Sequence, residues 1–316
     1  MASQNKCIAL DLGGTKLLIG IVTDTGEILE SRSYPSPLAG GGQQTEIAAY
    51  MRSCLRDFLS CHPACGASCI GAGVVGRVDG KRGLWLEIES GRCETVELAR
   101  FLEDACGLPC RVDNDVRCAL RAEQVLGHGK GLDDFIYINI GTGIASAMVS
   151  GGRVITGGSF NAGETGHFTV DISGGVQCPC GRTGCAEAIA SGSGLNRRAR
   201  ELRPRYPDSR LEIPNEAPCR AQDIFRLARE GDALCARLAQ DAQRAAAALI
   251  ENLVWTLDPK VIVLGGGIVA DSWMYAEIIK RLSKNSMRFT TGVYLTSLDP
   301  RCAGLIGAAM CGFDLP

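Results

Sequence analysis

The sequence has few aromatic residues, few histidines and no long apolar run. Phe, Trp and Tyr make up 5% of its 316 residues, and only three residues are histidine. No apolar run approaches the ~18 residues of a membrane helix, and the first residues lack the apolar core of a signal peptide. The net charge of -2 provides no field to recruit nucleic acid or an anionic membrane. We therefore expect a cytoplasmic protein that binds neither.

The rest of the composition is that of a globular chain. Hydrophobic residues make up 46% and charged residues 22%. The length exceeds what one hydrophobic core usually fills, so we expect two domains. Sixteen cysteines are spread along the chain. Because a cytosol keeps thiols reduced, we interpret most of them as small buried apolar residues.

Two stretches of the chain share the layout strand, glycine loop, strand, turn, strand. The expected strands are residues 7–10, 17–22 and a piece from Ile28 in the first stretch, and 135–140, 144–149 and 153–155 in the second. The roughly 130-residue spacing indicates a duplicated unit. Short apolar strands are common, so a chance similarity is the alternative.

Helical spacing of apolar residues predicts helices over 45–59, 97–105 and most of 221–258. A buried strand is expected at 260–264, and the proline-containing segment 203–218 is expected to be an exposed loop. Strands that alternate with helices indicate an α/β fold.

Three glycine loops each follow an apolar strand. They are Asp-Leu-Gly-Gly-Thr-Lys at 11–16, Gly-Thr-Gly at 141–143 and Gly-Gly-Gly at 265–267. Loops of this kind leave backbone N–H groups free and let a polyanion approach them closely. Neither the Walker spacing nor the dinucleotide Gly-x-Gly-x-x-Gly spacing is present. Each loop alone could be a plain tight turn, but together they indicate a cleft that holds a nucleotide between domains.

Three cysteines lie close together in Cys178-Pro179-Cys180-Gly181-Arg182-Thr183-Gly184-Cys185. Three thiols cannot pair off among themselves. The cluster therefore requires either an outside cysteine or a metal ion.

Seven segments carry a family resemblance. They are residues 11–16, Val-Asp-Asn-Asp at 112–115, Asn-Ile-Gly-Thr-Gly at 139–143, Gly-Glu-Thr-Gly-His at 163–167, the cysteine segment 178–187, 265–267, and Gly-Leu-Ile-Gly-Ala-Ala at 304–309. In these segments the sequence resembles the ROK family of sugar kinases (repressor, open reading frame, kinase), part of the actin-like, ribonuclease-H-like ATPase superfamily. The segment from the histidine to the cysteines is the most specific part.

The resemblance implies two actin-like α/β domains around a cleft, with a structural zinc motif. The smaller domain would span 1–115 and be rejoined by 304–316, and the larger would span 116–303 and carry the zinc segment. A homodimer is also implied.

The resemblance further implies that His167, Cys178, Cys180 and Cys185 bind one Zn²⁺. One histidine and three cysteines make a closed tetrahedral set, which is typical of a structural site. The alternative is a group of buried free cysteines beside an ordinary histidine.

The implied activity is ATP-dependent phosphorylation of a hexose or aminohexose, at the 6-hydroxyl. Asp115 would be the general base, and the sugar would be bound by Asn114, Asp115, Glu164, His167 and Glu187. ATP and Mg²⁺ would be bound by Asp11, Gly13, Gly14, Thr15, Lys16, Gly141, Thr142, Gly143, Gly265 and Gly266. The alternative for residues 113–115 is a polar turn or helix cap.

The sequence departs from the family pattern at positions that would face the sugar. Glu89-Ser90 stands where an Asn-Leu is common, and Arg117 replaces a frequent Asn. These side chains would select particular hydroxyl or amino substituents, or they are simply solvated. The rival functions are a non-catalytic sugar sensor and a ROK-type regulator lacking its DNA-binding domain, since no room for such a domain precedes Asp11.

Overall fold

The computed structural model describes residues 4–62, 66–89, 91–173, 175–299 and 302–314. Ser90, which the family comparison singled out, lies outside them. The chain divides into two compact units, each of α/β type. Unit 1 is Met1–Gly131, Thr156–Asn161 and Ser297–Pro316, and unit 2 is Leu132–Ile155 and Ala162–Thr296. Among the described residues, no helix combines the length and the apolarity needed to cross a membrane.

The first boundary between the units differs from the expected one. We placed it at residue 115, but unit 1 continues to Gly131, and the units are of nearly equal length. The reason is helix α3 (Asp115–Leu126), which packs on the C-terminal helix α9 (Ala303–Phe313). Cys118 and Ala122 of α3 share a buried cluster with Leu305. The return of the C-terminal segment to the first unit was expected.

Unit 1 is built on a five-stranded mixed sheet with the order β3-β2-β1-β4-β7. Its strands are β1 (Lys6–Leu12), β2 (Lys16–Thr23), β3 (Ile28–Pro35), β4 (Cys69–Val74) and β7 (Cys110–Asn114), with a separate hairpin of β5 (Arg77–Asp79) and β6 (Leu84–Glu87). The β1–β2 and β2–β3 pairs are antiparallel, whereas β1–β4 and β4–β7 are parallel.

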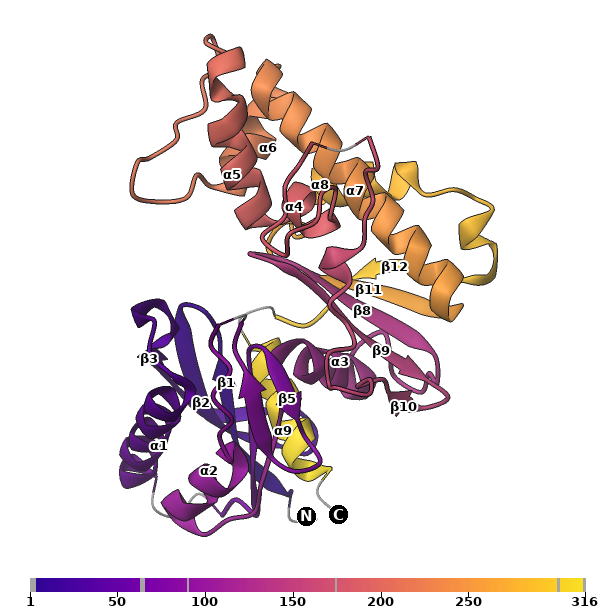
Figure 1. The fold of residues 1–316 in the computed structure, drawn as a ribbon. Helices are drawn as coiled ribbons and strands as arrows, with labels where there is room; N and C mark the ends of the chain where they lie inside the picture. The colour runs from indigo at the N-terminus through magenta and orange to yellow at the C-terminus, as the bar shows by residue number, and fades with distance from the viewer. Residues whose placement is uncertain (1–3, 63–65, 90, 174, 300–301, 315–316) are drawn as a thin grey trace. The chain divides into compact units, whose positions relative to one another are not determined.

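Helices cover both faces of this sheet. Because side chains alternate along a strand, Ile8 and Leu10 of β1 pack with α1 (Gln44–Cys61) and α2 (Leu98–Cys106), while Cys7 and Ala9 pack with α3 and α9. Figure 1 shows α9 in yellow beside the indigo strands, although the two segments lie at opposite ends of the sequence. Burial on both faces explains the nearly continuous apolar runs.

Unit 2 repeats this topology with the order β10-β9-β8-β11-β12. Its strands are β8 (Phe135–Ile140), β9 (Ile144–Ser150), β10 (Arg153–Val154), β11 (Val261–Gly265) and β12 (Gly292–Leu295). Again the first three strands in the sequence pair antiparallel, and the last two join in parallel. The identical order and pairing confirm the predicted duplication.

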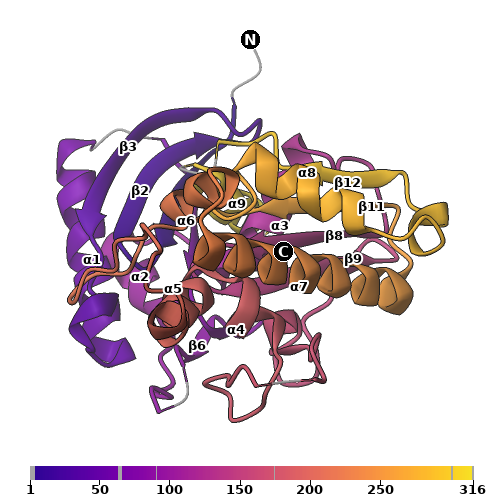
Figure 2. The same ribbon diagram turned by 90° about the horizontal axis from the view of Figure 1, so that it is seen from above.

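The helices of unit 2 pack on its sheet around one apolar core. They are α4 (Ala186–Ala190), α5 (Gly192–Leu202), α6 (Ala221–Arg229), α7 (Ala233–Leu257) and α8 (Ser272–Arg281), with short 3-10 turns η2 (Thr165–His167), η3 (Arg203–Arg205) and η4 (Ser286–Phe289). In Figure 2, α7 and α8 run over the strands β8, β11 and β12, and their apolar faces share the core with β8 and β11.

Two local predictions need correction. The helical stretch 221–258 is divided into α6 and α7, because Asp232 begins a new helix by accepting the N–H of Cys235 with its side chain. The segment 203–218 is not wholly exposed, since it starts as η3 and buries Leu211 in the core of unit 2.

Candidate functional site

In unit 1 the predicted site residues lie at the carboxyl ends of the parallel strands. Leu12 of β1, Val74 of β4 and Asn114 of β7 pair in register across the sheet. The glycine loop after β1 and Asp115 after β7 therefore emerge at the same edge. This edge is where open α/β sheets place their ligands.

The loop between β1 and β2 is a tight turn. The N–H of Gly13 donates to the carbonyl of Lys16 at 3.0 Å, and Ser36 donates to the carbonyl of Thr15. Within the part of the chain that the structure describes, the amides of Gly14 and Thr15 donate to no protein atom. Both residues are exposed, so the loop can offer two N–H groups to an anion.

Asp11 lies against the first turn of α9. A Cβ atom on Gly304 would come within 2.4 Å of the Asp11 carboxylate, so only glycine permits this approach. Burial raises the pKa of Asp11 to about 6, while the positive charge of Lys16 acts in the opposite direction. The N-terminal dipole of α9 also favours the ionised form. A half-buried carboxylate of this kind is a suitable oxygen ligand for Mg²⁺.

Asn114 caps helix α3. Its side-chain oxygen accepts the N–H groups of Val116 and Arg117 at 2.9 and 3.2 Å, and its amide donates to the carbonyl of Gly76 at 2.9 Å. The oxygen is thus engaged in capping, as the alternative interpretation expected. The second N–H of the amide is the part of Asn114 that can still serve a sugar hydroxyl.

Asp115 is the first residue of α3 and is half-buried. Its Oδ1 atom accepts the N–H of Val116 at 2.9 Å, which fixes the orientation of the carboxylate. A carboxylate in the first helical turn is also favoured by the helix dipole. This rigid position suits a group that must receive a proton from a substrate.

Arg117 does not belong to the sugar-facing surface. Its side chain is 3% exposed, and its Nε atom donates to Oδ1 of Asp113 at 2.5 Å while an Nη donates to the carbonyl of Val78. It is therefore neither solvated nor available to a substituent of the sugar. Glu89, by contrast, is exposed and pairs with Arg92 at 3.3 Å, as the solvated alternative expected.

In unit 2 the second glycine loop joins β8 to β9. The N–H groups of Gly192 and Ser193, at the start of α5, donate to the carbonyls of Gly141 and Thr142. In the described residues the amides of Thr142 and Gly143 have no protein acceptor. The loop is therefore held through its carbonyls and keeps two N–H groups for an anion.

The third glycine segment lies beside this loop. Gly265 ends β11, and Gly266 has φ +95°, a conformation that favours glycine. A Cβ on Gly141 would lie 4.0 Å from the Cα of Gly266 and 3.6 Å from the side chain of Asn139. The structure therefore brings together the residues expected to face phosphate and adenosine in this unit.

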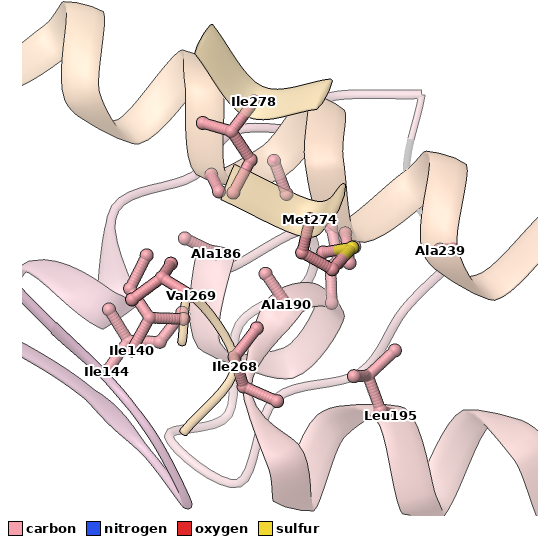
Figure 3. Close-up of a cluster of buried hydrophobic side chains, with 14 of the residues drawn as sticks. Ile140, Ile144, Ala186, Ala190, Leu195, Ala239, Ile268, Val269, Met274 and Ile278 are labelled. Carbon is pink, nitrogen blue, oxygen red and sulfur yellow. The ribbon is translucent and has the colours of Figure 1, made fainter. Parts of the chain in front are cut away.

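The apolar core anchors both ends of the second loop. Figure 3 shows Ile140 and Ile144, which flank residues 141–143, lying beside Ala186 and Val269. Ala186 also precedes Glu187 on α4. Buried neighbours on each side hold the loop and the carboxylate in fixed positions.

Glu187 contacts the glycine loop directly. Its Oε2 atom accepts the N–H of Ile144 at 2.9 Å, and a Cβ on Gly143 would lie 2.8 Å from the same oxygen. One oxygen of the expected sugar ligand is thus committed to the loop. Glu164 is exposed at the start of η2, the turn that ends in His167.

His167, Cys178, Cys180 and Cys185 converge, with all four ligand atoms within 4.8 Å of one another. Sγ of Cys178 lies 3.6 Å from Nδ1 of His167, and Sγ of Cys180 lies 3.7 Å from Sγ of Cys185. A disulfide would need about 2.05 Å. Tetrahedral ligands at the usual Zn–S distance of ~2.3 Å are about 3.7 Å apart, so the set fits Zn²⁺.

One thiol of the set favours the metal-binding form, whereas burial raises the pKa of Cys178 and raises that of Cys185 to about 12. A backbone N–H from Arg182 lowers the pKa of the exposed Cys180 to about 6, which favours the thiolate that a metal binds. Arg182 also donates to the carbonyl of His167, which ties the cysteine loop to η2.

Comparison with known proteins identifies the family. The ROK family profile matches residues 7–311. The chain belongs to the ROK family. Three relatives are glucokinase of Halalkalibacterium halodurans (31% identical over 83% of this chain and 80% of that protein), Beta-glucoside kinase of Listeria monocytogenes (32%, 96% of each) and N-acetylmannosamine kinase of Escherichia coli (31%, 96% and 97%).

Solved ROK structures share the fold over nearly the whole chain. A ROK glucokinase from Streptomyces griseus in complex with glucose and AMPPNP has a TM-score of 0.76 at 28% identity, covering 98% of this chain and 100% of that one. A ROK family transcriptional regulator has a TM-score of 0.81 at 25% identity, covering 97% of this chain and 77% of that one. With relatives that are sugar kinases, this ROK chain is an enzyme of the phosphotransferase class.

The sequence did not predict three features of the site. Asn139 lies between the second and third glycine segments, Gly76 accepts the amide of Asn114, and Trp255 is exposed on α7 near His167. Asn139 was visible as part of the motif 139–143. The other two carry no sequence signal, because their roles depend on residues far away in the chain.

Proposed function

We propose that this ROK protein transfers the γ-phosphoryl group of ATP to the 6-hydroxyl of a hexose or aminohexose. The observation that carries the proposal is the pair of glycine loops, each of which follows a buried strand and has two N–H groups with no acceptor among the residues that the structure describes. The kinases named among its relatives act on sugars of these two classes. Phosphoryl transfer requires mainly positioning and charge neutralisation, which such loops provide.

In the proposed reaction the Asp115 carboxylate accepts the proton of the sugar hydroxyl. The hydroxyl oxygen then forms a bond to the γ-phosphorus, and the bond from phosphorus to the ADP oxygen breaks. The products are the sugar phosphate, ADP and a proton that Asp115 returns to water. Asn114 orients α3 and hence the base, while Glu164, His167 and Glu187 bind sugar hydroxyls.

Two metal ions complete the proposal. Asp11 would hold the Mg²⁺ of Mg-ATP, which neutralises charge on the phosphates. Zn²⁺ bound by His167, Cys178, Cys180 and Cys185 would fix η2 and the start of α4, and with them Glu164 and Glu187. A cytoplasmic homodimer remains our expectation from the family resemblance.

The test is release of ADP from Mg-ATP against a panel that contains glucose, fructose, mannose and N-acetylmannosamine. Asp115→Asn should lower kcat by about 100- to 10,000-fold and leave sugar binding intact. Asp208→Asn, an exposed carboxylate, is the control. Sugar binding without turnover in the wild-type protein would instead indicate a non-catalytic sugar sensor.

A further inference from the structure

An open hollow of about 620 Å³ lies on unit 2 beside the residues proposed to bind sugar. Its lining includes Glu164 and His167 together with Asn252, Trp255 and Thr256 of α7. Pockets for organic ligands commonly measure ~300–1,000 Å³. The hollow therefore continues the proposed sugar site beyond Glu164 and His167.

Trp255 is the unusual side chain of this hollow. It is 59% exposed, whereas Trp85 is fully buried and Trp273 is half-buried. Asn252, Trp255 and Thr256 are spaced i, i+3 and i+4, so they share one face of α7. The result is a flat apolar surface flanked by a carboxamide and a hydroxyl.

This combination suits a carbohydrate ring. One face of a pyranose presents C–H bonds, which pack against the negative face of an aromatic ring, while its rim carries hydroxyl groups. Asn252 supplies a donor and an acceptor for such a rim, and Thr256, whose O–H donates to the carbonyl of Asn252 at 2.7 Å, supplies an acceptor; the exposed Arg182 and Thr169 line the same hollow.

The orientation of the His167 ring indicates where a sugar would lie relative to the hollow. Its Nδ1 atom faces Cys178, so Nε2 lies on the opposite edge of the imidazole ring. The ring thus has one nitrogen for the cysteine cluster and another for a substrate hydroxyl. A sugar held at Nε2 and Glu164 has the hollow, with Trp255, as its next neighbour.

We propose that the hollow is a subsite for a second ring, so that the substrate is a disaccharide or an aryl glycoside and not only a free hexose. The inference rests on the proposed sugar kinase function and names its substrate class. A glycoside joined through the anomeric oxygen keeps its 6-hydroxyl, and the chemistry of transfer is unchanged. The two-ring substrate gains contact area that a monosaccharide lacks.

The alternative is that a second copy of the chain packs on the exposed Trp255. Protein interfaces bury contiguous apolar surface. Here Trp255 and the half-buried Phe168 are surrounded by polar and charged side chains. The lining thus favours a sugar over a protein face.

The experiment compares glucose with cellobiose and phenyl β-D-glucoside in steady-state assays of the full chain. Trp255→Ala should raise KM for both two-ring compounds about tenfold with kcat unchanged, because a binding contact is lost, and should change KM for glucose less than twofold. Trp255→Phe should restore most of the affinity. Phe289→Ala removes another exposed aromatic side chain of unit 2, outside the hollow, and should leave KM unchanged for glucose and for both two-ring compounds.

Fluorescence gives a reading that does not depend on turnover. Cellobiose and phenyl β-D-glucoside should change the tryptophan emission of the wild-type protein and have no such effect on Trp255→Phe. Phosphorylation of glucose without phosphorylation of the two-ring compounds would overturn the subsite and leave the proposed function standing. An absence of turnover with every sugar would overturn the proposed function. Equal effects of Trp255→Ala on all substrates, or a change of molar mass without a change of KM, would also refute the subsite.

Discussion

Oε2 of Glu187 accepts the backbone N–H of Ile144 at 2.9 Å, which joins helix α4 to the glycine loop 141–143. Glu187 follows Cys185 by two residues, so the cysteine segment and the loop are mechanically linked. A change in the cysteine cluster would therefore reach the proposed phosphate site through one carboxylate.

Glu187→Ala should raise KM for ATP at least about tenfold, because a hydrogen bond that holds the loop contributes roughly 1.5–3 kcal/mol when one partner is charged. Glu187→Gln keeps an acceptor oxygen and should stay within about threefold of the wild type. The measurement is steady-state kinetics with ATP varied at saturating sugar. Glu216→Ala, on the surface, is the control, and an unchanged KM for ATP in Glu187→Ala would contradict the link.

The cysteine cluster should contain about one equivalent of zinc per chain, measured by metal analysis of the purified protein. Cys178→Ser should lose most of it and raise KM for the sugar, because Glu164 and Glu187 would no longer be held. Cys93→Ser, an exposed cysteine outside the cluster, should keep its zinc. A metal-free preparation with full activity would disprove the assignment.

Arg117→Met should lower the free energy of unfolding by about 2–4 kcal/mol, because the buried carboxylate of Asp113 loses its close ion pair and keeps the N–H of Asn114 at 2.8 Å and the more distant Arg121 at 3.6 Å. The control is Arg226→Met, which removes only exposed pairs with Asp223 and Glu230 and should leave the free energy of unfolding nearly unchanged.

Urea unfolding measures both variants. If Arg117 instead selected the sugar, as the sequence allowed, Arg117→Met would change the ratio of kcat/KM between sugars and leave stability intact.

The stability of the nucleotide-free protein should depend on Asp11 between pH 4 and 8. The folded-state pKa, about 6, lies above the ordinary value of 3.8, so the fold favours the neutral carboxyl group. The contribution of Asp11 to stability is therefore fully present below about pH 4 and is lost as the pH rises through 6.

Asp11→Asn removes this titration. Relative to that variant, the wild type should lose on the order of 1–2 kcal/mol between pH 4.5 and 7.5, a value reduced for the partial exposure of the group. Urea unfolding at several pH values measures the difference. Parallel profiles for the two proteins would show that burial does not perturb Asp11. Activity of Asp11→Asn should also fall, since the proposed Mg²⁺ ligand is gone.

The local sequence determined the repeated framework of this protein. Alternating and continuous apolar runs predicted β1, β2, β8, β9 and β11, and the glycine loops and the 3-cysteine spacing predicted where ligands could bind. These features depend on neighbours along the chain, so periodicity and spacing reveal them.

Only the tertiary structure decided how the polar side chains are used. Asn114 caps α3 and reaches Gly76, 38 residues away, and Glu187 reaches Ile144, 43 residues away. Arg117 is buried because Val78 and Asp113 surround it, and Trp255 is exposed because its face of α7 points away from the core. Hydrogen bonds and burial between residues distant in sequence arise when the sheets assemble, and no local pattern encodes them.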